Sequence, residues 1–325
     1  MTDGNNCTYY DEEDFTVVAA IRAVVGTLSA FCCLFVVAMI VLFRKYRCFC
    51  QRLILYLAVA AFFHSLSYPL ARVNYYTPRQ LLSPYCDFGG FFNLYTSWIE
   101  MLALCCLTFN IFLNAVLDKW LTKVEVIYVF LPYLLPLLWV WTPFIHWSFG
   151  NGEAWCDIRP VETDCTRYAF GDVLRFCLWY GPLYVLCLIM LISALAAAFM
   201  IRRKSKQWYG LHDPYQEQRI TMLRSEVGPL LWYPVFYSLL NLFSVANQID
   251  VAVDPTNTVI ALWYLHVLTS PFRGATIALV YALDSDTRRR LTWTQLKTAV
   301  YLLCKGDNIN EYSVINASVG DSITL

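Results

Sequence analysis

The chain has 325 residues, of which 58% are hydrophobic and 15% charged, and its formal net charge is zero. Soluble domains carry about 25% charged residues, so this composition excludes an ordinary soluble protein. A helix of about 20 mostly apolar residues spans the roughly 30 Å hydrocarbon core of a bilayer. We therefore predict an all-α membrane protein, a bundle of seven transmembrane helices. Its apolar runs are 17–43, 53–73, 87–117, 125–147, 173–201, 227–249 and 257–283.

The loops between these runs differ in charge. Lys and Arg are concentrated in the first, third and fifth loops and just after the last run, whereas the alternate loops carry few. Because cytoplasmic loops are rich in Lys and Arg, we predict a multi-pass plasma-membrane protein with residues 1–16 outside the cell. Asn6, in the triplet Asn6-Cys7-Thr8, is then a candidate glycosylation acceptor.

Four of the 13 cysteines fall on the predicted outer side: Cys7, Cys86, Cys156 and Cys165. Four cysteines allow three connectivities. We favour a Cys86–Cys156 disulfide, because it would pin the loop between the fourth and fifth runs over the bundle. A second bridge, Cys7–Cys165, would then tether the N-terminus to the same loop.

The segment after the last run predicts one more helix. Asp284 and its neighbours suit a helix start, and the apolar residues that follow are spaced for an amphipathic helix over 284–304, lying on the inner membrane lipid. Cys304 at its end is a candidate for palmitoylation, with a free thiol as the alternative. This divides the chain into an extracellular N-terminus, a transmembrane domain over 17–283, helix 284–304, and a cytoplasmic tail over 305–325.

Proline interrupts several of the runs, and Pro234 in the sixth is the one that suggests motion. A proline within a helix removes a hydrogen bond and bends the helix. Because the sixth run follows the basic fifth loop, a hinge at Pro234 could swing the inner end of that helix. The alternative is a static kink.

Three titratable residues lie deep inside the runs: His64, Glu100 and Arg273. At 1.5 Å per residue, Glu100 lies about 21 Å below the outer surface, and the other two lie about 16–18 Å above the inner one. Charges at this depth are costly and usually functional. We predict a Glu100–Arg273 ion pair with His64 beside it; the alternative is that each faces a water-filled cavity. Asparagines at similar depth could extend this polar network: Asn110, Asn114, Asn241 and Asn247.

Catalytic motifs are missing from the sequence. It contains no HExxH, GxSxG or P-loop pattern, and no lysine in a helix core that could bind retinal as a Schiff base. We expect no enzyme activity, no cofactor, no metal site and no nucleic-acid partner.

The helix count, the sidedness and the placement of Cys86 and Cys156 resemble those of a G-protein-coupled receptor. Two sequence motifs of rhodopsin-type receptors are absent. The third run does not end in Asp-Arg-Tyr, and the seventh does not end in Asn-Pro-x-x-Tyr. The sequence is instead similar to the secretin/adhesion receptors and the cAMP-receptor-like family. The similar segments are Arg52–Ala58, Trp155-Cys156-Asp157-Ile158, Pro234 and Phe272-Arg273-Gly274.

The chain departs from those families at the three deep residues. They usually carry Gln where this chain has Arg273, and the secretin branch usually carries Asn at the depth of Glu100 and a basic residue near His64. The resemblance implies a receptor that transmits an extracellular ligand signal to a heterotrimeric G protein. The alternative is a proton- or ion-coupled transporter or channel that uses the same three residues as a relay, although the runs are largely apolar away from the midplane.

Overall fold

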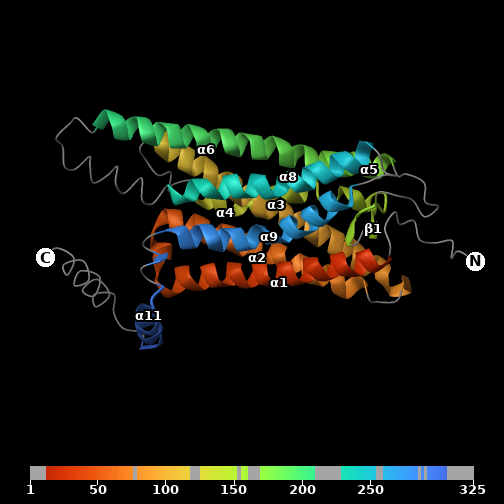
Figure 1. Ribbon diagram of the computed structural model, residues 1–325, viewed down its shortest axis with the longest axis horizontal. Coiled ribbons are helices and arrows are strands. Elements are labelled where there is room, and N and C mark those ends of the chain that lie inside the picture. Colours follow the sequence, from red (N-terminus) through yellow and green to blue (C-terminus); the bar gives the residue numbers. More distant parts are fainter. Residues whose placement is uncertain are drawn as a thin grey trace, which may run out of the picture.

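The computed structural model describes residues 12–75, 79–117, 125–151, 155–159, 169–208, 228–253, 259–284, 287–288 and 291–305. Long helices lie side by side along the long axis of the molecule (Figure 1). The start of α1 and a small β-hairpin lie at one end, called here the hairpin end. Helix α11 lies at the other, called the α11 end.

The first three helices are long and continuous. They are α1 (Glu12–Leu42), α2 (Phe49–Tyr75) and α3 (Arg79–Leu117), with the 3-10 turn η1 (Lys45–Arg47) between the first two. Each begins a few residues before the corresponding apolar run. Apolar composition marks the part of a helix that lies in hydrocarbon, whereas backbone hydrogen bonding continues into the more polar flanks.

The fourth run does not form the continuous helix predicted over 125–147. The α-helix α4 spans Glu125–Leu134 and is followed by two 3-10 segments, η3 (Leu135–Leu138) and η4 (Thr142–Phe144). Proline has no N–H to donate and clashes with the preceding turn, so it interrupts α-helical hydrogen bonding. Three prolines fall in this run: Pro132, Pro136 and Pro143.

The fifth run lies in a helical rod with an irregular turn. It consists of α5 (Ala169–Arg175), a π-helical turn η5 (Phe176–Tyr180) and α6 (Gly181–Trp208). The carbonyl of Leu178, within the π turn, accepts a hydrogen bond from the Trp98 indole at 2.9 Å. This bond ties the irregular turn to α3.

The sixth and seventh transmembrane helices are α8 (Trp232–Val253), preceded by the 3-10 turn η6 (Pro229–Leu231), and α9 (Ile260–Leu283). The amphipathic helix predicted over 284–304 is found as α11 (Trp293–Lys305), which begins nine residues later than expected. Asp284, at the C-terminal end of α9, does not cap α11; its carboxylate accepts hydrogen bonds from the backbone N–H and the hydroxyl of Thr287.

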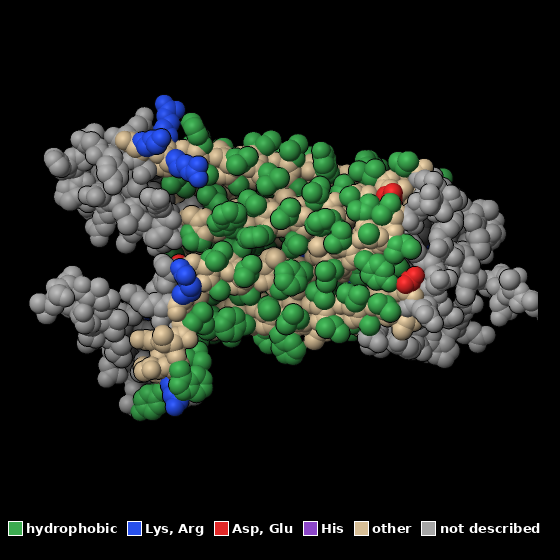
Figure 2. All heavy atoms as spheres, in the orientation of Figure 1, with side chains coloured by type: hydrophobic (Ala, Val, Ile, Leu, Met, Phe, Trp, Pro, Cys, Tyr) green, Lys and Arg blue, Asp and Glu red, His purple; other side chains and the backbone are tan. Residues whose placement is uncertain are grey.

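The predicted membrane fold is confirmed. Within the described residues, six helical segments are individually long and apolar enough to cross a bilayer: Thr16–Leu42, Phe49–Leu70, Pro84–Val116, Glu125–Phe144, Ala169–Lys204 and Pro229–Val251. The seventh, α9, has 24 residues, packs against α1, α2 and α8, and carries polar side chains on its buried face. Hydrophobic side chains cover the middle of the visible surface, with Lys and Arg at the α11 end and Asp and Glu at the hairpin end (Figure 2).

Close packing fixes α9 against α1 and α2. A Cβ atom at Gly274 would lie 2.7 Å from Ser65 Oγ and 2.9 Å from Cys33 Sγ, so only glycine permits this approach. The Ser29 hydroxyl of α1 donates to the Pro271 carbonyl at 2.5 Å and accepts from the Ala275 N–H at 3.2 Å. These contacts hold Arg273, which lies between them on α9, at the centre of the bundle.

Candidate functional site

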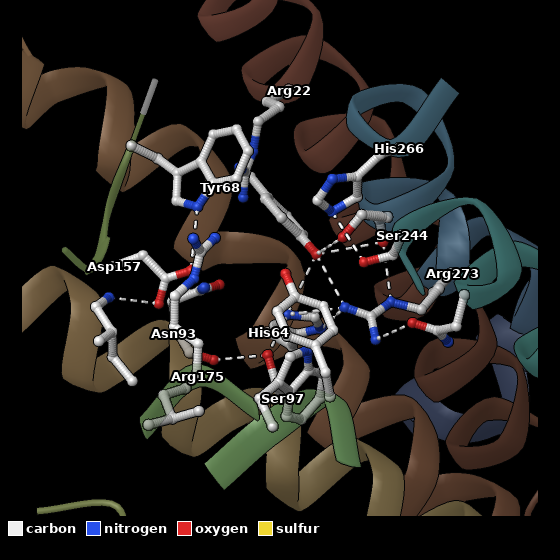
Figure 3. A pocket seen from close by; sticks show the side chains of 17 residues that line it. Arg22, His64, Tyr68, Asn93, Ser97, Asp157, Arg175, Ser244, His266 and Arg273 are labelled. Atoms are coloured by element: carbon white, nitrogen blue, oxygen red, sulfur yellow. Dashed lines mark hydrogen bonds between the residues drawn. The ribbon is translucent and has the colours of Figure 1, made fainter. Parts of the chain in front are cut away.

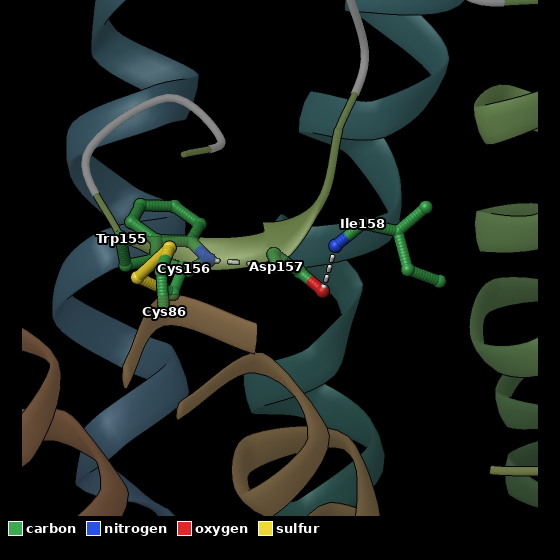
Figure 4. The surroundings of a disulfide bond; sticks show 5 residues. All are labelled: Cys86, Trp155, Cys156, Asp157 and Ile158. Atoms are coloured by element: carbon green, nitrogen blue, oxygen red, sulfur yellow. Dashed lines mark hydrogen bonds between the residues drawn. A yellow bond between two sulfur atoms is a disulfide. The ribbon is translucent and has the colours of Figure 1, made fainter. Parts of the chain in front are cut away.

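A disulfide-anchored hairpin closes one end of the bundle. Strands β1 (Phe149–Asn151) and β2 (Cys156–Ile158) pair antiparallel, with Gly150 opposite Asp157. The predicted Cys86–Cys156 disulfide is present and joins β2 to α3 (Figure 4). A Cβ atom at Gly90 of α3 would lie 2.8 Å from the Phe149 ring, so the hairpin rests directly on α3.

The three deep titratable residues meet in the centre of the bundle. His64, Glu100 and Arg273 are exposed by only 2%, 1% and 4%. The shortest contact joins His64 Nδ1 to Glu100 Oε2 at 2.6 Å. Arg273 Nη1 lies 3.9 Å from the same carboxylate oxygen. The predicted ion pair is therefore a long one, and the imidazole makes the closer contact with Glu100.

Arg273 is bound by hydrogen bonds from three helices. Its Nε donates to the Ser270 carbonyl at 2.9 Å, within α9. Its Nη2 donates to the Tyr68 hydroxyl of α2 at 3.1 Å. Its Nη1 donates to the Tyr237 hydroxyl at 3.2 Å and to Asn241 Oδ1 at 3.4 Å, both on α8. Arg273 thus joins α2, α8 and α9, and its contact with Glu100 adds α3.

The surroundings of His64 fit a neutral imidazole that donates from Nδ1. The Nδ1–H then donates to Glu100, which as a carboxylate can only accept. Nε2 is left to accept, and it faces Ser97 Oγ at 2.8 Å, Tyr68 OH at 3.2 Å and Arg273 Nη2 at 3.3 Å. With His64 neutral, the charges of Glu100 and Arg273 cancel, as a buried ion pair requires. We call these residues the central network: His64, Tyr68, Ser97, Glu100, Tyr237, Asn241, Ser270 and Arg273.

The asparagines predicted to extend this network divide into two groups. Asn241 belongs to it, and Asn247 lies 3.5 Å from the ring of His266 through its amide nitrogen. Neither amide atom of Asn110 has a hydrogen-bond partner within the described structure, and the same is true of Asn114 Nδ2. These two residues, further along α3, are not part of the network.

A cavity lies between the hairpin and the central network. Its volume is about 40 Å³. Figure 3 shows Arg22, Arg175 and His266 converging on it beside His64 and Arg273. The complete lining is Arg22, His64, Tyr68, Asn93, Leu94, Ser97, Trp155, Asp157, Ile158, Arg175, Trp179, Tyr180, Asn241, Ser244, His266, Ser270 and Arg273.

Among the described residues that line this cavity, positive side chains outnumber negative ones. Arg22, Arg175 and Arg273 carry guanidinium groups and Asp157 carries a carboxylate, while Glu100 lies 3.9 Å from Arg273. All three arginines are buried. Low-dielectric walls lined by one sign of charge concentrate the field and attract the opposite sign. The cavity is therefore suited to a small anion.

Sequence reasoning missed Arg22, Arg175 and His266. Arg22 and Arg175 lie near the starts of the first and fifth apolar runs, and His266 is the tenth residue of the seventh. All three nonetheless have buried side chains. The sequence did contain a signal for the two arginines, because an arginine inside an apolar run indicates a buried charge.

The structure describes only some of the other predicted site residues. Pro234 is the third residue of α8, directly after the 3-10 turn η6; a hinge there stays a prediction. The backbone of Cys304 lies in α11, and its side chain is outside the described residues. Asn6, Cys7 and Cys165 are outside them as well. Within the described part of the chain, no three His, Cys, Asp or Glu side chains are grouped to hold a metal ion.

Comparisons with known proteins agree with this architecture. No protein-family model matches the chain. The "Cyclic AMP receptor-like protein A" of Dictyostelium discoideum is 23% identical over 285 residues, which cover 87% of this chain and 69% of that protein. The crystal structure of squid rhodopsin superposes with a TM-score of 0.65 at 13% identity, over 94% of this chain and 91% of rhodopsin.

The structural likeness shows that the fold is the seven-helix fold of rhodopsin, and the sequence likeness extends over most of the bundle. Nothing found favours the transporter alternative. The chain therefore has the seven-helix fold of rhodopsin, as the sequence predicts, and over most of its length it is similar to a cyclic AMP receptor-like protein.

Proposed function

We propose that this receptor faces the cell exterior with its hairpin end, binds a small anionic ligand in the cavity beneath the hairpin, and activates a heterotrimeric G protein at its α11 end. The observation that carries the proposal is the cavity with three buried arginines, directly above the central network of a receptor fold.

Charge and redox chemistry support the orientation. Lys and Arg lie at the α11 end of the visible surface and acidic groups at the hairpin end (Figure 2), which is the distribution expected when the α11 end is cytoplasmic. The Cys86–Cys156 disulfide lies at the hairpin end, and disulfides persist in the oxidising exterior.

The ligand class follows from the lining. A phosphate or carboxylate group can accept from guanidinium donors in two places at once, and Arg22 and Arg175 reach the cavity from different helices. A relative is named for cyclic AMP, so cyclic nucleotides are the first anions to test. The present cavity holds about three water molecules at about 10–15 Å³ each, so a ligand of that size requires the site to widen.

Shared residues couple the cavity to the rest of the bundle. His64, Tyr68 and Arg273 line the cavity and also belong to the central network. A ligand that prefers one arrangement of these residues shifts the receptor toward it by its difference in affinity for the two states. At the α11 end, Lys204 of α6 donates to the Ala115 carbonyl of α3 at 2.7 Å. Breaking this contact would let α6 move away from α3.

The test is a G-protein activation panel in cells, run without ligand and then with cyclic nucleotides and other small phosphates and carboxylates. We expect coupling to at least one G protein and a response to at least one anion. Loss of a hydrogen bond to a charged group costs about 1.5–3 kcal/mol, so Arg175→Gln should raise the half-maximal concentration roughly 10-fold or more.

Lys297→Gln, on α11 at the far end of the molecule, is the matched control and should leave the ligand response unchanged. Receptors must be compared at equal surface expression. Failure to activate any G protein would overturn the assignment of coupling. A ligand response that is the same in Arg22→Gln, Arg175→Gln and wild type would overturn the assignment of the site.

A further inference from the structure

One side chain of the hairpin, that of Trp155, inserts between the helices and lines the cavity. Trp155 directly precedes Cys156, whose disulfide to Cys86 fixes the backbone at this point (Figure 4). Although it comes from a loop, Trp155 is only 6% exposed. Trp147, also close to the hairpin, is 74% exposed. The burial of Trp155 is therefore specific to its position.

The indole lies between groups from α1 and α9. The Arg22 Cζ atom is 3.5 Å from the centroid of its ring, within the range of a strong cation–π contact. The His266 ring meets it nearly perpendicularly, at 87° and 5.9 Å between centroids. The apolar residues packed in the same cluster are Val18, Trp263 and Val267.

The polar edge of the indole has a weaker partner. Its Nε1–H points to Asp157 Oδ2 at 3.5 Å (Figure 4), which is long for a hydrogen bond. Asp157 Oδ1 meanwhile accepts from the backbone N–H of Ile158 at 2.8 Å. The carboxylate is held in place by the backbone and is still able to accept a shorter bond from another donor.

We propose that the space filled by the Trp155 indole is a ligand subsite for a flat heteroaromatic ring bearing an N–H donor, and that the ring of the ligand replaces the indole. The subsite supplies a cation over the ring face, an imidazole at its edge, an apolar floor and a carboxylate acceptor. The proposal rests on the proposed function only in that a ligand enters beneath the hairpin. The small residual cavity supports the exchange, because it has no room for such a ring while Trp155 is in place.

The subsite is one contact away from the central network. The Arg22 Cζ atom also lies 4.9 Å from the centroid of the Tyr68 ring. The Tyr68 hydroxyl in turn accepts from Arg273 Nη2 at 3.1 Å. Arg22 thus contacts the occupant of the subsite on one side and Tyr68 of the central network on the other. A change of occupant therefore alters the contacts of Tyr68 and, through them, those of Arg273.

The test measures thermal unfolding of the purified full-length receptor, with free indole as the probe. Trp155→Ala removes the resident ring and should lower the Tm, whereas Trp147→Ala, the exposed control, should not. Millimolar indole should then raise the Tm of Trp155→Ala by roughly 2–4 °C when it is well above its Kd. It should leave wild type and Trp147→Ala unchanged, because their subsite is filled.

Adding Arg22→Gln to Trp155→Ala should abolish the indole shift, since the cation over the ring face is lost. If Trp155→Ala does not accumulate, the readout is its yield with indole in the growth medium, which should recover toward that of wild type. No indole effect on either Tm or yield, or an equal shift in wild type, would overturn the proposal. Neither readout involves a G protein, so this failure is distinct from failure of coupling.

Discussion

The ion pair between Glu100 and Arg273 can be tested through its coupling energy. Glu100→Gln removes the one carboxylate that, among the described residues, forms an ion pair with the Arg273 guanidinium, which is 4% exposed. Arg273→Gln leaves Glu100 with His64 as its close partner at 2.6 Å, and that imidazole can take up a proton and supply the missing positive charge. The double variant carries two neutral amides, and no charge is left unpaired.

The expected magnitudes follow from the geometry. Removing one partner of a buried ion pair costs about 3–5 kcal/mol, whereas replacing both partners by neutral groups is often much less damaging. Two unit charges about 4 Å apart attract by about 4 kcal/mol at an effective dielectric constant of 20. We therefore expect the double variant to be more stable than the sum of the single changes by about 2–4 kcal/mol, with Glu100→Gln the more damaging single change.

The measurement is a double-mutant cycle on the unfolding free energy of the purified receptor. Thr108→Val is the matched control on α3. Thr108 is buried and its hydroxyl donates to its own helix at Leu104, away from the network. Combined with Arg273→Gln, it should be additive within about 0.5 kcal/mol, as distant sites are. Additivity of Glu100→Gln and Arg273→Gln within the same error would refute the ion pair as an energetic unit.

Three further changes have expected outcomes. Gly274→Ala should destabilise the receptor by about 1–3 kcal/mol through overpacking of α9 against α1 and α2, measured as a lower Tm; a Tm equal to wild type would contradict the close approach. Cys86→Ser and Cys156→Ser should reduce surface expression equally, and the double variant no further, as counted by flow cytometry; an additive loss would mean that the two act separately. Lys204→Met should raise ligand-independent G-protein activation by freeing α6 from the Ala115 carbonyl; unchanged basal activity at equal expression would argue against that restraint.

The central network was predictable because its charges are conspicuous in the sequence. His64, Glu100 and Arg273 interrupt apolar runs at similar depth, and depth along a helix can be counted at 1.5 Å per residue. Which of the three would touch most closely was not predictable. The 2.6 Å contact of His64 with Glu100 depends on how the helices are rotated, and residue spacing along one helix does not determine that rotation.

The cavity was harder to foresee, because it lies in the half of the bundle next to the hairpin, near the ends of the helices. Arginines there resemble ordinary charges at helix ends. Arg22 is the clearest case: α1 begins at Glu12, so Arg22 lies well inside the helix and is 6% exposed. The π turn at Phe176–Tyr180, which brings Trp179 and Tyr180 to the cavity, has no sign in the sequence. The break of α4 was foreseeable, because three prolines lie in its run.

The charges of the central network suggest how an anion could act without moving a charge through the membrane. Glu100 and Arg273 cancel only while they remain partners. An anion that approaches Arg273 from the cavity competes with Glu100 for the same guanidinium. The Glu100 carboxylate then keeps the His64 Nδ1–H at 2.6 Å as its remaining close donor, while Arg273 still holds α8 through Tyr237 and Asn241. Once His64 takes up a proton, Glu100 and Arg273 each again have a partner of opposite charge, and the switch avoids the cost of an unpaired charge in low dielectric. Networks built of amides have no such partner to exchange, so here we expect the sign of the ligand charge to decide whether Arg273 changes partner.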